Sequence, residues 1–250
     1  MSLTKKILDS KKPFTLFHTY SASEDIVRKA IGEKKSMDLD VCVDGSGKPY
    51  LGHSEEYYEK SGEARAVSMP IWEAVGLVSK AMIPVVIDCK HPDAWPVVEK
   101  TVSRIGAQKC LVHSFAEELR FGYSRREGEP DYLTEWSNLG RLLSFKKKFP
   151  QVSTCASCKW LPDDLLISDK YENLLGGIRK LLKDNRIDTV CLNVPNGTFS
   201  DGPLKYFLSG GIICHVGIDG LDVSKFTEIY IGETDDLDAA SRCNFFDNLQ

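Results

Sequence analysis

The chain lacks a long hydrophobic run, and none approaches the about 20 apolar residues that a membrane-spanning helix needs. Residues 1–13 are polar and contain lysine, so they also lack the apolar core of a secretion signal. The eight cysteines lie mostly within short apolar segments, where cysteine behaves as a small hydrophobic residue. We therefore expect a reduced, cytoplasmic protein with no transmembrane segment; an exported protein whose signal has been removed is the alternative.

Positive charge is not in excess either. The 36 Asp and Glu residues outnumber the 32 Lys and Arg residues, which gives a formal net charge of −4. A nucleic-acid-binding domain usually carries clustered basic residues, so we expect no nucleic-acid partner. The sequence has no linker, low-complexity tract or internal repeat, and 250 residues can bury a large core. We expect a single domain over residues 1–250, and the sequence gives no indication of its oligomeric state.

Eight strand-like segments recur along the chain and alternate with helix-like segments. The first runs into His18-Thr19-Tyr20-Ser21, without the glycine-rich phosphate turn that often follows the first strand of an open doubly wound sheet. Eight β-then-α units without a compositional break instead predict an α/β fold, a (β/α)8 TIM barrel with a parallel eight-stranded sheet. The predicted strands are Phe14–His18, Met37–Val43, Pro84–Lys90, Lys109–Ser114, Gln151–Ala156, Ile187–Asn193, Gly211–Val216 and Thr227–Gly232.

The segments between these strands have the spacing of amphipathic helices. Pro70 supports one helix start, because proline is favoured in the first turn. The irregular stretch Phe121–Asp131 follows the fourth strand and is rich in Gly, Arg and Glu, so we interpret it as a lid over the catalytic side of the barrel. The predicted helices are Ser23–Glu33, Met69–Ala81, Asp93–Ile105, Leu133–Phe149, Asp169–Asp184, Pro203–Leu208 and Asp235–Asn248, with a short turn near Asp222.

Two carboxylates lie on one face of a hydrophobic strand. In the run Met37–Val43 the apolar side chains alternate with Asp38 and Asp40, so both aspartates point to the same side. Like charges on one face of a buried strand repel each other and lose hydration. A bound cation is the simplest way to remove that cost, and the pair therefore indicates a metal site.

Further polar residues end the neighbouring strands. His18 closes the first strand, His53 follows a turn after the second, and Asp88 and Lys90 share a face at the end of the third. In barrels of this kind the chemistry lies at the C-terminal ends of the strands. Three carboxylates, two imidazoles and one ammonium group are therefore predicted to meet at one mouth of the barrel.

This set of side chains suits metal-assisted cleavage of a phosphodiester. Three carboxylates with waters form a hard-oxygen site for one divalent ion, Mg²⁺ first and Ca²⁺ second. The ion would neutralise phosphate oxygens and the charge that develops in the transition state. One histidine can act as base or nucleophile and the other as acid, and Lys90 can hold a phosphate oxygen.

Each residue also has an ordinary structural explanation. Asp38 and Asp40 fit a solvated face of an edge strand, and His18 or His53 alone is more often a hydrogen-bonded structural histidine. Asp88 and Lys90 fit an ion pair between strand ends. The coincidence of all six at one end of adjacent strands favours the functional interpretation.

Several motifs resemble the glycerophosphodiester phosphodiesterase family. In that family an acidic-x-Asp strand is followed by a turn and a histidine, as in Met37-Asp38-Leu39-Asp40-Val41, Asp44-Gly45 and Gly52-His53. Ile87-Asp88-Cys89-Lys90 is similar to the family's third strand, and Val112-His113-Ser114-Phe115 to its fourth. The spacing from His18 to Asp38 is closer to that of the related sphingomyelinase D-like phospholipases, which share the barrel, the histidines and an Asp-x-Lys.

The resemblance implies a role for each residue at the mouth. Asp38, Asp40 and Asp88 would be the metal ligands. His18 and His53 would be the acid–base or nucleophile pair, and Lys90 would contact a phosphate oxygen. The sequence departs from the family at four places. His18 is followed by Thr19-Tyr20 rather than Arg-Gly, Ser21-Ala22-Ser23 replaces Glu-Asn-Thr, and Asp38 stands where glutamate is usual. The seventh strand also lacks the family's aromatic residue.

We therefore expect a metal-dependent phosphodiester hydrolase acting on a small-molecule or lipid-headgroup substrate, either a glycerophosphodiester or a lysophospholipid-like molecule. Sequence does not separate hydrolysis from intramolecular transfer that gives a cyclic phosphate. The alternative is a catalytically inactive barrel that binds a phosphorylated ligand or partner. A third interpretation is a barrel that acts on sugars or carboxylic acids through a carboxylate-bound metal.

Overall fold

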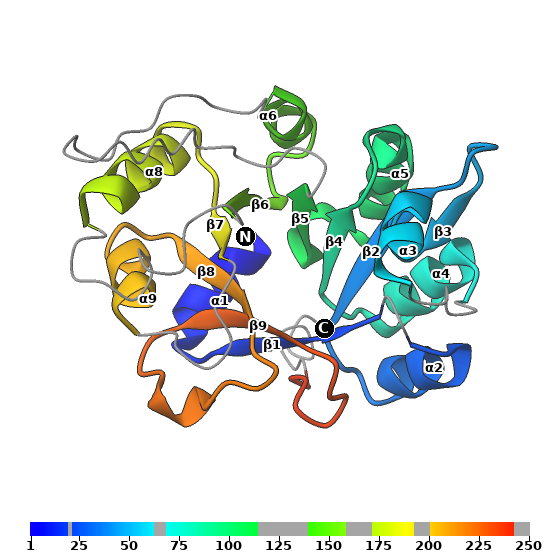
Figure 1. The fold of residues 1–250 in the computed structure, drawn as a ribbon, viewed down its shortest axis with the longest axis horizontal. Coiled ribbons are helices and arrows are strands. Elements are labelled where there is room, and N and C mark those ends of the chain that lie inside the picture. The colour runs from blue at the N-terminus through cyan, green and yellow to red at the C-terminus, as the bar shows by residue number, and fades with distance from the viewer. Residues whose placement is uncertain (20–21, 63–68, 115–139, 159–171, 193–200, 243–250) are drawn as a thin grey trace.

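Eight parallel strands form a closed barrel in the computed structural model, which describes residues 1–19, 22–62, 69–114, 140–158, 172–192 and 201–242 (Figure 1). Each strand pairs with the next, and the ring closes because β1 pairs with both β2 and β9. The predicted (β/α)8 fold is confirmed. The barrel strands are β1 Phe14–His18, β2 Met37–Val43, β4 Val85–Cys89, β5 Cys110–Ser114, β6 Ser153–Cys158, β7 Thr189–Leu192, β8 Ile213–Gly217 and β9 Tyr230–Thr234.

Helices lie outside the ring of strands and cover it (Figure 1). Apolar residues between the two layers, such as Val78, Val102 and Phe207, are fully buried and form the larger hydrophobic core. No helix in the described ranges is long and apolar enough to cross a membrane. The outer helices are α2 Glu24–Gly32, α4 Ile71–Ala81, α5 Trp95–Ile105, α6 Gly140–Lys148, α8 Glu172–Asp184 and α9 Asp201–Leu208, with 3₁₀ turns η1 Pro92–Ala94, η2 Ala107–Lys109 and η3 Val223–Lys225.

The strand predictions are most accurate at the start of the chain. The bounds of β1 and β2 match those predicted. The prediction for the last strand is wrong by several residues, because β9 begins at Tyr230 and ends at Thr234 rather than Gly232. The error arises because Glu233 and Thr234 are polar, although their place in the barrel wall makes the strand continue through them.

The predicted helix Asp235–Asn248 is wrong over its described part. Residues 235–242 form turns and one antiparallel bridge between Arg242 and Lys35. Their carbonyl groups are used by the ends of the neighbouring strands, since Ala239 O accepts from Thr15 Oγ1 at 2.8 Å and Ala240 O from Lys35 Nζ at 2.8 Å. A helix would need those carbonyls for its own hydrogen bonds.

Five predicted segments lie outside the described residues, wholly or in part. They are the proposed lid Phe121–Asp131, the first part of the helix Leu133–Phe149, the start of the helix Asp169–Asp184, the last residue of the strand Ile187–Asn193 and the last residues of the terminal helix. Three elements were not expected from the sequence. These are helix α1 Leu3–Ser10, the short antiparallel strand β3 Pro49–Leu51 beside β2, and helix α3 Glu55–Ser61.

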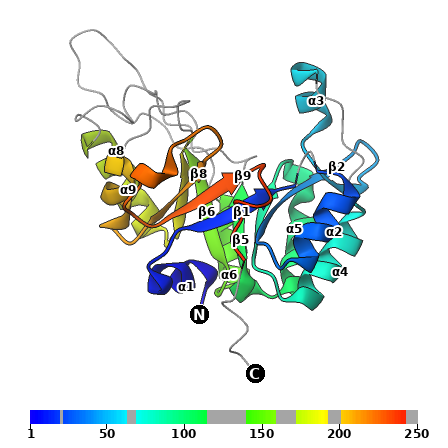
Figure 2. The ribbon, with the colours of Figure 1, turned by 90° about the horizontal axis from the view of Figure 1, so that it is seen from below.

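Helix α1 closes the N-terminal end of the barrel. Its Leu3 and Ile7 are fully buried and pack with inward-facing strand residues such as Phe14 and Leu111. Both the amide and the hydroxyl of Thr4 lie 2.9 Å from the hydroxyl of Ser153, the first residue of β6. Figure 2 shows α1 at one end of the barrel and α3 at the other. Because α1 fills the N-terminal end of the barrel with apolar side chains, the polar side chains of the barrel interior lie toward its C-terminal end.

We predict that Ile7→Ala lowers the free energy of unfolding by about 2–5 kcal/mol, because it leaves a cavity in the plugged end of the barrel. The matched control is Ile26→Ala in helix α2. The side chain of Ile26 is 42% exposed, so this change should alter the free energy of unfolding by less than about 0.5 kcal/mol. Urea unfolding followed by circular dichroism measures both. Equal destabilisation by the two changes would show that α1 is not part of the barrel core.

Candidate active site

The structure brings together all six polar residues predicted to meet at the barrel mouth. Asp38 and Asp40 on β2 and Asp88 on β4 are almost completely buried and face the barrel interior. His18 ends β1, and His53 follows β3. Lys90, predicted as the end of its strand, lies directly after β4, where its amide donates to Val41 O at 2.9 Å.

Asp40 lies at the centre of this group. Its Oδ2 is 2.8 Å from Nε2 of His53 and 3.3 Å from Nε2 of His18, and its Oδ1 is 3.2 Å from Nζ of Lys90. Burial raises the pKa of Asp40, but Lys90 and His18 outweigh it and hold the pKa well below its usual value. One carboxylate therefore orients both imidazoles and the ammonium group.

Lys90 and Asp88 form the second close pair. Nζ of Lys90 donates to Oδ2 of Asp88 at 2.6 Å. Burial lowers the pKa of Lys90, but Asp40 and Asp88 raise it well above its usual value, so the side chain stays charged. Burial raises the pKa of Asp88, and the opposing effect of His113 and Lys90 leaves it below its usual value.

His53 is held by the β3–α3 segment that the sequence did not predict. The hydroxyl of Tyr50 donates to His53 O at 2.7 Å, and the amide of His53 donates to the hydroxyl of Tyr58 at 3.1 Å. Gly52 has a φ of 136°, and a Cβ there would lie 2.8 Å from the hydroxyl of Tyr58. A glycine is therefore required for the turn that carries the imidazole to Asp40.

His18 contacts carboxylates through both ring nitrogens. Nε2 faces Asp40, while Nδ1 is 3.0 Å from Oε1 of Glu233 and 3.4 Å from Oδ1 of Asp235. Burial lowers the pKa of His18, but Glu233 and Asp40 outweigh it and raise the pKa well above its usual value. The adjacent Thr19 donates its hydroxyl to Asp38 O at 2.6 Å and fixes β1 to β2.

Asp38 carries the site's uncompensated charge. Both of its carboxylate oxygens are buried and have no hydrogen-bond partner among the described residues. Burial, followed by the negative charges of Glu233 and Asp40, raises the pKa of Asp38 well above its usual value. A buried polar group left in this state is costly, so the geometry fits a cation that coordinates it.

The donor atoms are close enough for one ion. One carboxylate oxygen each from Asp38, Asp40 and Asp88 lie within 4.8 Å of one another, and so do donor atoms of His18, Asp38 and Glu233. Oxygen donors of this kind suit Mg²⁺ or Ca²⁺. Small shifts of buried carboxylates would bring them to coordination distance of a shared cation.

Glu233 is the main site residue that the sequence analysis missed. Its Oε1 lies 3.0 Å from Nδ1 of His18, and its Oε2 lies 3.3 Å from Nε2 of His215. The predicted last strand ended one residue before it. The signal that would have found it is alternation, since Ile231 faces the barrel interior and Glu233 lies two residues further along β9. His113 and His215, left unassigned by the sequence, also face the interior.

Comparisons with known proteins support the fold. No protein-family model matches the sequence, and no curated protein matches it either. Similar solved structures include glycerophosphodiester phosphodiesterases from Agrobacterium tumefaciens str. C58 (TM-score 0.53, 9% identity) and Parabacteroides distasonis ATCC 8503 (TM-score 0.51, 11% identity), each covering 90% of this chain and 94% of the other. Mycobacterium tuberculosis tryptophan synthase also matches (TM-score 0.50, 11% identity, 93% of this chain and 88% of the other). These likenesses show the shared barrel.

We predict that Asp38→Asn raises the melting temperature of the metal-free protein, because it removes a buried carboxyl group that neighbouring carboxylates disfavour. About 1 kcal/mol corresponds to roughly 2–4 °C at this chain length. The same change should abolish the rise in melting temperature that Mg²⁺ or Ca²⁺ gives the wild type. Differential scanning calorimetry in chelator and in each metal measures both effects. A metal-induced rise that survives in Asp38→Asn would remove Asp38 from the ligand set.

Proposed function

We propose that this protein is a metal-dependent phosphodiesterase similar to the glycerophosphodiester phosphodiesterases, acting on a glycerophosphodiester or a lysophospholipid-like substrate. The observation that carries the proposal is the contact of two imidazoles, His18 and His53, with one buried carboxylate, Asp40. Beside them, Asp38 and Asp88 complete a three-carboxylate group. The likeness of the fold to two phosphodiesterase structures supports this choice among barrel activities.

Metal dependence follows from the charge of the site. Asp38, Asp40, Asp88 and Glu233 place four carboxyl groups around the mouth, and a phosphodiester is itself an anion. Without a cation, these carboxylates would repel the substrate. Asp38, Asp40 and Asp88 would hold the ion, Mg²⁺ in the first instance, which supplies charge neutralisation at the phosphate when bound.

The two histidines are placed to transfer protons at one phosphorus. Their side chains are 14% and 16% exposed, so they lie at the open surface of an otherwise buried cluster. Their ring centroids are 6.2 Å apart, which lets both reach the same phosphodiester. One removes a proton or attacks, and the other protonates the leaving oxygen. Asp40 orients both rings through their Nε2 atoms, and Lys90 supplies a fixed positive charge beside them.

We predict that His18→Ala and His53→Ala each lower kcat/KM by about 10²–10⁴-fold, the usual contribution of a positioned acid or base. The control is His91→Ala, which removes an exposed histidine beyond the site and should leave the rate unchanged. The assay is Mg²⁺-dependent release of choline from glycerophosphocholine and lysophosphatidylcholine.

Unchanged turnover in both site variants would contradict the mechanism. Binding of the phosphodiester without any turnover by the wild type would favour a non-catalytic barrel. Turnover of sugars or carboxylic acids with no phosphate in the substrate would favour the third interpretation. Phosphorus NMR of the products distinguishes hydrolysis from formation of a cyclic phosphate.

We predict that Glu233→Gln lowers kcat with little change in KM, because Glu233 is a positioning residue that orients His18 through Nδ1. If it acts through that ring, the double variant His18→Ala/Glu233→Gln should be no slower than His18→Ala alone. Steady-state kinetics of the four proteins in the cycle provide the test. Independent, multiplicative losses would show that Glu233 does not act through His18.

A further inference from the structure

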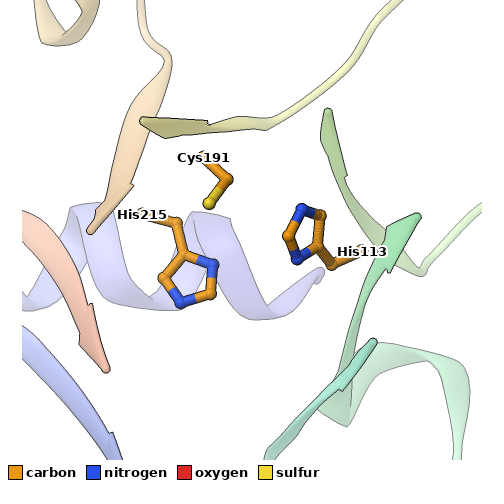
Figure 3. A group of neighbouring side chains, drawn as sticks. All are labelled: His113, Cys191 and His215. Atoms are coloured by element: carbon orange, nitrogen blue, oxygen red, sulfur yellow. The ribbon is translucent and has the colours of Figure 1, made fainter. Parts of the chain in front are cut away.

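A second group of potential metal ligands lies on the wall of the barrel formed by β5, β7 and β8. His113, Cys191 and His215 come from these three strands and are all buried. One donor atom of each lies within 4.8 Å of the other two. Figure 3 shows Cys191 pointing toward the space between the two imidazole rings, whose centroids are 5.8 Å apart.

The chemistry of these donors differs from that of the carboxylate site. One thiol and two imidazoles suit Zn²⁺, whereas Mg²⁺ and Ca²⁺ prefer oxygen. In a tetrahedral zinc site, Zn–N and Zn–S bonds of normal length place the donors about 3.3–3.6 Å apart. The donors lie within 4.8 Å of one another, so they need to approach each other by at most about 1.2–1.5 Å when an ion binds.

A carboxylate lies behind each of the two imidazoles. Nδ1 of His113 lies 3.3 Å from Oδ2 of Asp88, and Nε2 of His215 lies 3.3 Å from Oε2 of Glu233. Nδ1 of His215 is buried and has no hydrogen-bond partner among the described residues. Carboxylate–histidine pairs of this kind are typical of zinc sites, because they fix the tautomer and ring orientation.

A fourth side chain marks where a non-protein ligand would lie. Ser157 on β6 is directly opposite Cys191 in the parallel register of β6 and β7. Its hydroxyl is buried and has no hydrogen-bond partner among the described residues. A water in the fourth coordination position would satisfy this hydroxyl. Three protein ligands and one open position are the arrangement of zinc sites that bind water or substrate.

We propose that His113, Cys191 and His215 form a second metal site, selective for Zn²⁺ and separate from the carboxylate site that would hold Mg²⁺. The structural alternative is polar packing inside the barrel. Among the described residues, that alternative leaves the Nδ1 of His215 and the hydroxyl of Ser157 buried without hydrogen-bond partners, each at a cost in free energy. One ion with one water satisfies both. Binding requires the thiolate, so the Cys191 thiol loses its proton when the metal enters.

The test uses Co²⁺ as a spectroscopic probe for Zn²⁺. Reduced, metal-free protein is titrated with Co²⁺ in excess Mg²⁺, which occupies the carboxylate site. We expect one equivalent of Co²⁺ to produce a thiolate-to-metal charge-transfer band that Zn²⁺ abolishes. Cys191→Ser should eliminate the band, and His215→Gln should weaken Zn²⁺ binding at least about 10-fold in competition with a chromophoric chelator.

The matched control is Cys214→Ser, which changes a buried cysteine on the neighbouring strand β8 that faces away from the lumen and contacts Pro203 O. Cys214→Ser and Asp38→Asn should both keep the band, so loss of the carboxylate site does not mimic loss of this one. No band in the wild type, or a band that persists in Cys191→Ser, would overturn the proposal.

A measurement on the wild type guards against variants that do not fold. Alkylation of Cys191 in metal-free protein, followed by mass spectrometry, should be slowed by one equivalent of Zn²⁺. Labelling of Cys214 should not respond in the same way. Equal rates at Cys191 with and without Zn²⁺ would also overturn the proposal. None of these measurements requires phosphodiesterase activity, so their outcome is independent of the function proposed above.

Discussion

Repulsion among buried carboxyl groups is the constraint on which the rest of the site depends. Asp38, Asp40 and Asp88 project from adjacent strands into one space, and Glu233 adds a fourth carboxyl group from β9, two strands away from β2 around the ring. Lys90, His18 and His53 compensate Asp40 and Asp88, but Asp38 has no such partner among the described residues. The folded barrel therefore lacks a positive charge beside Asp38 at its C-terminal end. A divalent cation has the charge and ligand preference to correct it.

The barrel separates stability from chemistry along its axis. The N-terminal end is filled by apolar side chains and closed by α1, whose Leu3 and Ile7 make no contact with solvent. This end supplies hydrophobic burial that offsets the cost of the polar end. Natural barrels place their active sites at the C-terminal ends of strands, where loops vary without disturbing the wall. The distribution of His, Asp and Glu here follows that division.

Local patterns in the sequence were sufficient to predict the barrel and the site residues on β1 and β2. Alternation in β2 put Asp38 and Asp40 on one face, and the end of β1 located His18, because both are short-range properties. Glu233 was missed because its strand continues through polar residues that only the closed ring buries. The support of His53 by Tyr50 and Tyr58 depends on a hairpin and a helix without strong local signals.

Long-range pairing explains the remaining errors. Nothing local shows that Cys191 on β7 lies beside His215 on β8, since their proximity follows from register across the wall. The segment 235–242 was predicted to be helical, but its carbonyls accept hydrogen bonds from Lys35, Ser36 and Thr15, far away in the chain. Tertiary hydrogen bonds thus outweigh helix propensity, which contributes less than about 1 kcal/mol per residue.

Within the described part of the chain, two register pairs join β1 with β2, Phe17 with Met37 and His18 with Asp38, whereas β2 and β4 share five. Segment 235–242 bridges this junction from outside through Arg242 and Lys35. Backbone segments held by few contacts open locally at a lower cost in free energy than well-paired ones. His18 and Asp38 form one of these two pairs, so opening of the junction would separate two residues of the candidate site. Segment 235–242 opposes that opening, because it makes hydrogen bonds with Thr15 on β1 and with Ser36 directly before β2.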